Sequence, residues 1–486
     1  MPGRRFFQKG NVNVPPTNES GAGLQRFALI LVGIVAIGIV PFSFSSFIFS
    51  SNIQGQSLGA LLVNTSSTTA SAAQIFESGG QIHTDVQNGS SQDESGLVKR
   101  ALSSEALEQS MPLLGQAEAR LIKIYQLISQ AERKKALQQA EALVHDYPNF
   151  HLANLVLGDL LSVSSRPISQ VGDVPGANAL AAHKQLEVLR EQSRRRLQAL
   201  TERPPTGSVP SQFVSVSLKS RHAIAVDASR SRLYLFENQQ LNGENSQLTL
   251  VGDYYISVGQ SGVEKVSEGD LRTPVGVYYI TSNLDASKLP DLYGAGALPI
   301  NYPNALDTQR GKTGSGIWLH GSPSEQFARP PLASEGCVVL SNQDLKTLLS
   351  KVETRTTPVV IAPDLKWVMP EALSKERQQF NQALEDWRAS KSQGDTAKLK
   401  SFYSTRFDSQ GQKLVDWWPR TESEMHAMGV KTVEMKDVSV LNWRDTDDTM
   451  VVTFGELRGG QSRGVTKRQY WIREGLAWKI FNEGTV

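Results

Sequence analysis

The sequence of 486 residues has only one cysteine, Cys337. A single thiol excludes a disulfide framework within the chain and any zinc or iron–sulfur site held by several thiolates. His320 has no second ligand at a usual metal-binding spacing, and the remaining histidines are scattered along the chain. We therefore expect neither a metal ion nor another cofactor.

Net charge is also nearly absent, because 50 Lys and Arg residues oppose 48 Asp and Glu residues and leave +2. A chain so balanced has no basic surface spread over the whole molecule, so we expect no nucleic-acid partner. With 39% hydrophobic and 20% charged residues, the composition is that of a globular protein, which excludes global disorder and a polytopic membrane protein. The length predicts two to four domains, at about 100–200 residues each.

Long apolar runs are missing except at residues 27–49, FALILVGIVAIGIVPFSFSSFIF, which carry no charge. At about 1.5 Å per residue, such a helix can cross about 30 Å of hydrocarbon. Four basic side chains precede the run and the next is Lys99, so the positive-inside rule places the N-terminus in the cytoplasm. A cleaved signal peptide is the alternative, but the leader is long and no small-x-small site closes the run. The sequence thus predicts a single-pass anchor, with the rest of the chain outside the cytoplasm.

Residues 50–96 are rich in Ser, Thr, Gly, Asn and Gln and have no periodic apolar pattern, so we expect a flexible tether. From 97 to 200 apolar residues recur at helical spacing, with a break at residues 147–150, YPNF. The pattern resembles one tetratricopeptide-like unit, and a plain helical spacer is the other interpretation. Arg194, Arg195 and Arg196 lie on the last of these helices and are expected to form a solvated face.

After residue 213 the sequence changes to short β-branched or alternating runs separated by Gly, Asn, Asp and Pro. Such runs predict a predominantly antiparallel sheet domain. The expected strands are residues 214–218, 222–227, 232–236, 248–258, 275–280, 317–320 and 358–362.

The tail from residue 371 predicts helices followed by a curved sheet, which is the order of a cone-shaped α+β fold. The first helix carries the apolar stripe Phe380, Leu384 and Trp387. A second helical piece is expected at 399–407, and strands near 433–443, 449–457 and 470–481. The stretches EDWRASKSQGD, FYSTRF and AWKIFNEG resemble the nuclear-transport-factor-2-like superfamily. We expect this part to bind substrate or a partner, because fold alone confers no chemistry.

Two residues with catalytic potential stand seventeen positions apart. His320 ends an expected strand, and the only thiol follows in Ser334-Glu335-Gly336-Cys337. A thiol of pKa about 8.5 is mostly protonated at neutral pH and needs a base, a task that imidazole suits. Gly336 permits a tight turn, and backbone N–H groups beside the thiol could hold an oxyanion. Taken singly, Cys337 is typical of a buried small hydrophobe and His320 of a structural residue.

These residues belong to a composite pattern, in which Gly259, Lys265 and residues 268–278, EGDLRTPVGVY, precede the elements His-Gly and Ser-x-Gly-Cys. Over about residues 215–363 the pattern resembles the L,D-transpeptidase (YkuD-type) catalytic domain. The resemblance implies that Cys337 is the acylated nucleophile and His320 its general base. It also implies that the carbonyl of Gly321 orients the imidazole, that Ser334 and Gly336 shape the nucleophile loop and oxyanion site, and that Arg272, Arg329 and Asp270 are candidate contacts for substrate charges.

The family's substrate is a peptidoglycan stem tetrapeptide, cut between the L-centre of a diamino acid and a terminal D-alanine. The acyl-enzyme then passes to an amine or to water. One position departs from the commonest signature, S-x-G-C-(I/V)-R, because Val339 stands where Arg is expected. Valine cannot make the two-point contact of arginine with a carboxylate, which counts against cross-linking. L,D-carboxypeptidase and amidase reactions therefore stay open beside L,D-transpeptidation, as does a non-catalytic peptidoglycan-binding scaffold.

The sequence as a whole predicts a multidomain cell-wall enzyme held in the inner membrane, with a periplasmic catalytic part. Its expected partners are peptidoglycan stem peptides, the membrane through one N-terminal helix, and a protein bound by the helical or C-terminal domain. The expected boundaries are 1–26 for a cytoplasmic tail, 27–49 for the anchor, 50–96 for the tether, 97–200 for the helical or tetratricopeptide-like part, 201–213 for a linker, 214–363 for the mainly-β catalytic domain and 371–486 for the α+β cone.

Overall fold

The computed structural model describes residues 90–163, 171–172, 177–240, 246–459 and 464–486. The expected cytoplasmic tail, the anchor at 27–49 and the tether up to residue 89 lie outside these residues. Within the described ranges, no helix is both long and apolar enough to cross a membrane. The first described helix, α2 (Ser90–Ala101), begins inside the stretch expected to be tether.

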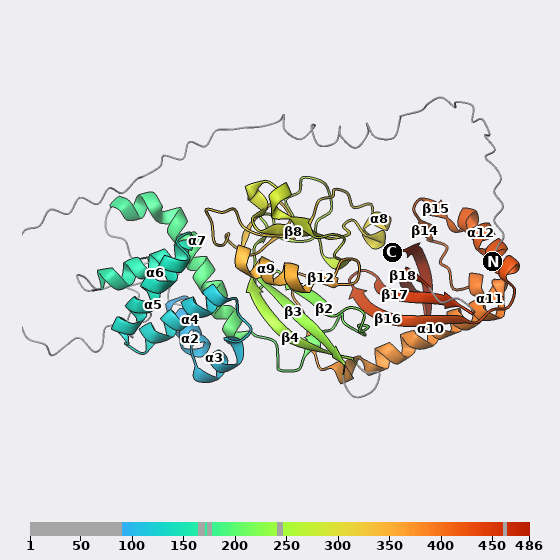
Figure 1. Cartoon of the computed structure of the whole chain (residues 1–486), viewed down its shortest axis with the longest axis horizontal. Helices are drawn as coiled ribbons and strands as arrows, with labels where there is room; N and C mark the ends of the chain where they lie inside the picture. The colour runs from blue at the N-terminus through green and yellow to red at the C-terminus, as the bar shows by residue number, and fades with distance from the viewer. Residues whose placement is uncertain (1–89, 164–170, 173–176, 241–245, 460–463) are drawn as a thin grey trace, which may run out of the picture. The chain divides into compact units, whose positions relative to one another are not determined.

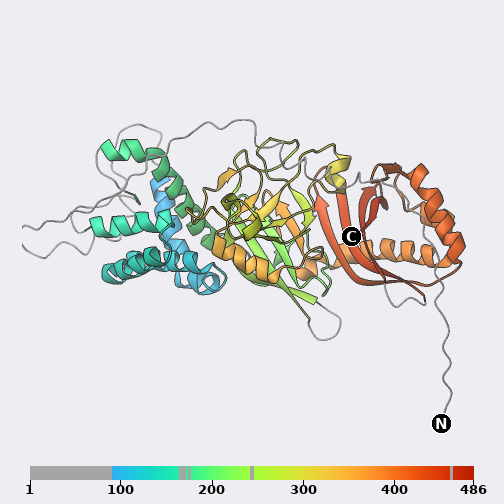
Figure 2. The same cartoon turned by 45° about the horizontal axis from the view of Figure 1, so that its top comes forward.

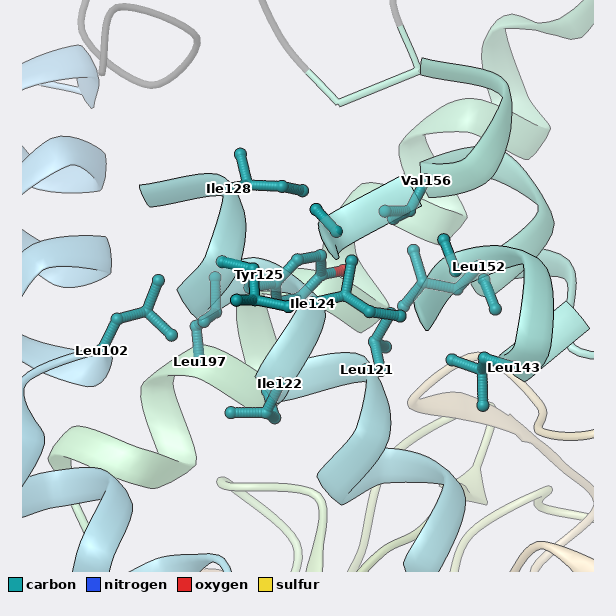
Figure 3. Close-up of a cluster of buried hydrophobic side chains, with 14 of the residues drawn as sticks. Leu102, Leu121, Ile122, Ile124, Tyr125, Ile128, Leu143, Leu152, Val156 and Leu197 are labelled. Carbon is teal, nitrogen blue, oxygen red and sulfur yellow. The ribbon is translucent and has the colours of Figure 1, made fainter. Parts of the chain in front are cut away.

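Helices α2 to α7 make up the first part of the described chain (Figure 1). The five after α2 are α3 (Ser104–Ser110), α4 (Gln116–Ser129), α5 (Arg133–Asp146), α6 (His151–Ser162) and α7 (Ala177–Thr201). They share one apolar core, because residues three and four apart fall on the same helix face. Leu121, Ile124 and Tyr125 of α4 lie in it with Leu143 of α5 and Leu197 of α7 (Figure 3). The helical prediction is confirmed, while the tetratricopeptide-like resemblance stays a prediction.

Arg196 corrects the expected solvated arginine face of α7. Arg194 and Arg195 pair with Glu191 and stay partly exposed, but the Arg196 side chain is only 1% exposed. Its guanidinium lies 3.6 Å from a carboxylate oxygen of Glu118 and 3.7 Å from the ring centroid of Tyr255. A buried cation needs such partners, and both come from distant parts of the sequence.

The mainly-β domain, which the sequence predicts to be catalytic, is built on a five-stranded sheet of order β4-β3-β2-β12-β6. Its strands are β2 (His222–Asp227), β3 (Arg232–Gln240), β4 (Ser246–Tyr255), β6 (Gly276–Tyr279) and β12 (Pro358–Ala362). The expectation of a predominantly antiparallel sheet is confirmed, since three of its four strand pairs are antiparallel. β12 runs antiparallel to β6 but parallel to β2, since the chain crosses over through a second sheet and a helix before returning.

The second sheet has the order β11-β9-β8-β7 and carries the candidate site. Its strands are β7 (Leu284–Asp285), β8 (Gly296–Pro299), β9 (Trp318–His320) and β11 (Val338–Val339). The remaining short elements of the domain are β1 (Val209–Pro210), β5 (Val258–Gly259), α8 (Ala305–Gln309), β10 (Leu332–Ser334), α9 (Asn342–Lys351) and β13 (Trp367–Val368), with 3₁₀ turns at Ala286–Lys288, Asp291–Tyr293 and Pro370–Leu373.

Residues 214–218, an expected strand, do not form one. A single bridge joins Ser215 to Val440, while the neighbouring Val214 and Val216 insert into different apolar cores. The alternation in the sequence therefore reflects burial on two sides of an irregular segment.

Both faces of the five-stranded sheet are buried, which explains why β2, β6 and β12 contain few polar residues. Ile224 and Val226 of β2 face a core shared with the second sheet and α9. The alternate residues Ala223 and Ala225 face a core shared with the C-terminal sheet. The C-terminal domain thus covers one face of the five-stranded sheet.

The C-terminal domain packs helices against a four-stranded antiparallel sheet, as Figure 2 shows. Its elements are α10 (Ser374–Gln393), α11 (Thr396–Lys400), β14 (Asp408–Ser409), β15 (Gln412–Lys413), α12 (Leu414–Met428), β16 (Val433–Arg444), β17 (Asp448–Arg458), β18 (Val465–Glu474) and β19 (Ala477–Thr485). The expected stripe Phe380, Leu384 and Trp387 is buried against one face of this sheet. Its other face, which includes Leu441 and Val451, packs on the mainly-β domain.

Three details of this domain differ from expectation. The expected strand at 470–481 is a hairpin of β18 and β19, turning at Gly475, whose φ of 62° favours glycine. The helical piece expected at 399–407 ends at Lys400. Helix α12 was not expected, because Pro419, its sixth residue, lacks the N–H that a helix interior uses and suggests a break.

Candidate active site

His320 is the last residue of β9, and its imidazole is buried. Its Nδ1 lies 2.7 Å from the carbonyl oxygen of Gly321. A carbonyl only accepts hydrogen bonds, so we assign the proton to Nδ1, which leaves the lone pair of Nε2 unprotonated. The Tyr293 ring meets the imidazole edge to face, at 5.1 Å between centroids. The structure therefore gives Gly321 the orienting position that the family resemblance implies.

Cys337 immediately precedes β11, and β11 runs parallel to β9 with Val339 opposite His320. Cys337, one residue before β11, is therefore at the level of Trp318, two residues before His320 on the neighbouring strand. The thiol donates to the carbonyl of Gly316 at 3.5 Å, and among the described residues no hydrogen bond joins it to His320. Catalytic hydrogen bonds often tighten only when substrate binds, so this geometry is compatible with proton transfer between the two.

The loop before the thiol is held by Ser334 and Gly336. The buried Ser334 hydroxyl donates to the carbonyl of Cys337 at 2.6 Å and accepts from the N–H of Gly336 at 3.2 Å. Gly336 has φ of 126°, and a Cβ there would lie 2.8 Å from the carbonyl oxygen of Arg272. Only glycine fits such a turn, so both residues shape the loop that presents the thiol.

Arg272 and Asp270, two candidate substrate contacts, are engaged elsewhere. The exposed Arg272 touches the loop through its backbone carbonyl, while its guanidinium donates to the carbonyl of Val263 at 2.9 Å. Asp270 accepts from the buried Lys265 ammonium at 2.7 Å and from backbone N–H groups, and these contacts lower the pKa of its carboxyl against the effect of burial. Both residues stabilise the turn that precedes β6.

Tyr293 packs against His320, and the charge of Arg329 acts on both His320 and Cys337. Burial raises the pKa of the Tyr293 hydroxyl, and the charges of Cys337 and Glu335 add to this. Burial lowers the pKa of Arg329, against the opposing influence of the same two groups. Sequence reasoning named Arg329 only as one candidate of three and missed Tyr293, because nothing in the stretch DLYGAG marks it as a neighbour of His320.

The electrostatics leave both catalytic candidates uncharged at neutral pH. Burial, with a smaller contribution from the positive charge of Arg329, lowers the pKa of His320 to about 4 against the opposing effect of the hydrogen bond to Gly321. Burial also raises the pKa of the Cys337 thiol, which the N–H of Trp318 and the charge of Arg329 oppose. A neutral imidazole can accept a proton, so the pair can work by general base catalysis, starting without a thiolate–imidazolium ion pair.

Alkylation of the free protein checks this charge state. The rate of Cys337 alkylation by iodoacetamide is expected to rise with pH through and beyond the ordinary thiol range of about 8.5, because only the thiolate reacts. Intact-mass spectrometry measures the rate directly, since the chain has no other cysteine. A rate that is already constant at neutral pH would show a preformed ion pair and contradict the assignment.

The described residues contain no group of three or more His, Cys, Asp or Glu side chains placed to hold a metal ion.

Comparison with known proteins agrees with this geometry. Residues 221–361 match the family model of the L,D-transpeptidase catalytic domain, YkuD, and residues 379–484 match that of the Cds6 C-terminal NTF2-like domain. Searching the curated proteins gave no match.

The solved structures that are similar to the chain include the following two. Bd1075 of Bdellovibrio bacteriovorus is 27% identical, with a TM-score of 0.48, over 57% of this chain and 98% of that one. The helical cell shape determining protein Pgp2 of Campylobacter jejuni is 22% identical, with a TM-score of 0.44, over 56% of this chain and 96% of that one. The family matches identify the two domains: the chain contains an L,D-transpeptidase catalytic domain followed by a nuclear-transport-factor-2-like domain.

Proposed function

We propose that this protein processes peptidoglycan stem peptides by acyl transfer through Cys337. The observation that carries the proposal is the pairing of β9 with β11, which brings Cys337, one residue before β11, to the strand that ends in the neutral imidazole held by Gly321. The match to the L,D-transpeptidase catalytic domain supports the choice of substrate class.

The reaction follows from the protonation states. Nε2 of His320 takes the thiol proton as the sulfur attacks the carbonyl carbon of the scissile amide. Backbone N–H groups beside the thiol stabilise the oxyanion, other than that of Gly336, which donates to Ser334. The imidazolium then returns the proton to the departing amine, the C–N bond breaks, and a thioester remains on Cys337. An amine or a water molecule attacks this thioester and regenerates the thiol.

A second candidate function shares the acyl-enzyme and differs only in the group that accepts the acyl fragment from Cys337. Val339, where the family signature has arginine, is buried and lies on the same strand face as Cys337 by alternation. The position offers no charge to a second stem peptide. This favours water as the acceptor and an L,D-carboxypeptidase reaction that releases the terminal amino acid.

The proposal also covers where the protein is located and what it binds. We place the catalytic domain outside the cytoplasmic membrane, on a single N-terminal anchor, because residues 27–49 are uncharged and follow a basic segment. The helical part or the C-terminal domain is the proposed surface for a protein partner.

The test is to incubate the full-length protein with sacculi rich in tetrapeptides and to analyse the muropeptides. Tripeptides with a free terminal amino acid mean carboxypeptidase, cross-linked dimers between diamino acids mean transpeptidase, and a released peptidoglycan-bound protein means amidase. The Cys337→Ala variant should form none of these. If the native protein changes nothing, or the variant turns over as fast, the catalytic proposal fails and a binding scaffold replaces it.

A further inference from the structure

The loop between the histidine and the cysteine, residues 323–331, is held at one end by the YPNF turn between α5 and α6. Phe327 is buried and stacks on Phe150, with 4.1 Å between ring centroids. The N–H of Phe327 donates to the carbonyl of Asn149 at 3.1 Å, and the Asn149 amide donates to the carbonyl of Ser324 at 2.9 Å. The helical part of the chain therefore fixes this loop by both packing and hydrogen bonds.

The other end of the loop is fixed by the catalytic domain. The Tyr255 hydroxyl donates to the carbonyl of Arg329 at 3.0 Å, and the N–H of Val258 donates to the carbonyl of Pro331 at 2.9 Å. Arg196 covers the Tyr255 ring. Prolines at 330 and 331 restrict the backbone further. The backbone of Arg329 is thus held on both sides.

The side chain of Arg329 has unused hydrogen-bonding capacity. It is half-buried, and its buried Nε has no hydrogen-bond partner in the described part of the chain. No carboxylate of the described residues lies within ion-pair distance of its guanidinium. The positive charge of Arg329 lowers the pKa of both Cys337 and His320. Leaving a guanidinium partly desolvated and unpaired costs free energy, which a bound anion would recover.

We propose that Arg329 binds a carboxylate group of the acyl donor beside Cys337, and that the YPNF turn and Tyr255 position it for this contact. The planar guanidinium suits the two oxygens of a carboxylate. The donor's identity as a stem peptide rests on the proposed function; the carboxylate contact itself does not.

A pair of alkylating reagents tests the contact without any cell-wall substrate. Iodoacetate and iodoacetamide react alike, with the thiolate sulfur forming a bond to carbon as iodide leaves, but only iodoacetate carries a carboxylate. The ratio of their rates on the full-length protein cancels any change in thiol ionisation. Arg329→Gln is expected to lower the ratio of iodoacetate to iodoacetamide about tenfold, the loss of one charge-assisted contact.

Two further variants sharpen the result. Arg329→Lys should keep most of the ratio, because it keeps the charge. Arg420→Gln, at a side chain 84% exposed in the C-terminal domain, should leave the ratio unchanged. An unchanged ratio in Arg329→Gln would overturn the assignment.

The same ratio of alkylation rates tests whether Tyr255 positions Arg329. Tyr255→Phe removes only the hydroxyl that holds the Arg329 carbonyl, and should lower the ratio by about threefold. An unchanged ratio would remove Tyr255 from the proposal.

With stem peptides, Arg329→Gln should raise KM for donors with a free carboxyl terminus and leave amidated donors unaffected. Equal KM changes for both donors would refute the contact with substrate. If the native protein forms no product but the alkylation ratio still falls in Arg329→Gln, the proposed function fails and the anion contact stands.

Discussion

Replacing Arg232 by alanine should lower the free energy of unfolding by about 3–5 kcal/mol, the usual cost of breaking a buried ion pair. Arg232 is fully buried; it donates to Asp253 at 2.6 Å and to Glu118 at 2.8 Å. Glu118 belongs to α4 and Asp253 to β4, so the guanidinium joins the helical part to the catalytic sheet. Its removal leaves two buried carboxylates, of which only Glu118 has a second arginine, Arg196, nearby.

Denaturant unfolding followed by circular dichroism measures the loss, with Arg120→Ala as the matched control. Arg120 also pairs with a carboxylate from the helical part, Asp146, at 2.7 Å, but both side chains are solvated. This control should lose less than about 1 kcal/mol. If both variants lose the same free energy of unfolding, the buried ion pairs of Arg232 stabilise the fold no more than an exposed ion pair does.

Replacing His320 by asparagine should slow acylation of Cys337 by about 10²–10⁴-fold, the range for loss of a general base. Asparagine can still donate to the Gly321 carbonyl, so the strand end keeps a hydrogen bond while the proton acceptor is gone. Rapid-quench mass spectrometry with a stem peptide would follow the thioester. For the native protein, the same rate should fall as the pH drops through about 4, where the imidazole becomes protonated.

The control for His320→Asn is alkylation by iodoacetamide at alkaline pH. An ionised thiol needs no base, so this reaction should change little if the variant is folded. An acylation rate close to native would show that another group takes the proton, and would end the role assigned to His320.

The parts of the fold predicted best are those whose patterns are local. The strands at 222–227 and 358–362 are unbroken apolar runs and match β2 and β12 residue for residue. The stripe Phe380, Leu384 and Trp387 has helical spacing and is buried in α10 as expected. Residues 214–218 alternate like a strand, but no neighbouring strand pairs with them beyond one bridge. Whether a segment pairs depends on a partner elsewhere in the chain, which the segment's own sequence does not reveal.

In the candidate site, too, the residues that lie close together in the sequence were predicted, and the contacts from distant residues were not. His320, Gly321, Ser334, Gly336 and Cys337 lie within eighteen residues, and the structure brings them together through the pairing of β9 and β11. The surroundings of Arg329 depend on Asn149 and Phe150, more than 170 residues earlier in the chain. No sequence pattern links the YPNF turn to that loop, so only the folded chain reveals the contact.

The solitary thiol also determines how the protein responds to oxidants. Peroxide would convert Cys337 to a sulfenic acid, which is normally rescued by a neighbouring thiol that forms a disulfide. This chain has no second cysteine to do so. Recovery must come from a thiol on another molecule, and without one the sulfur would proceed to the irreversible sulfinic state.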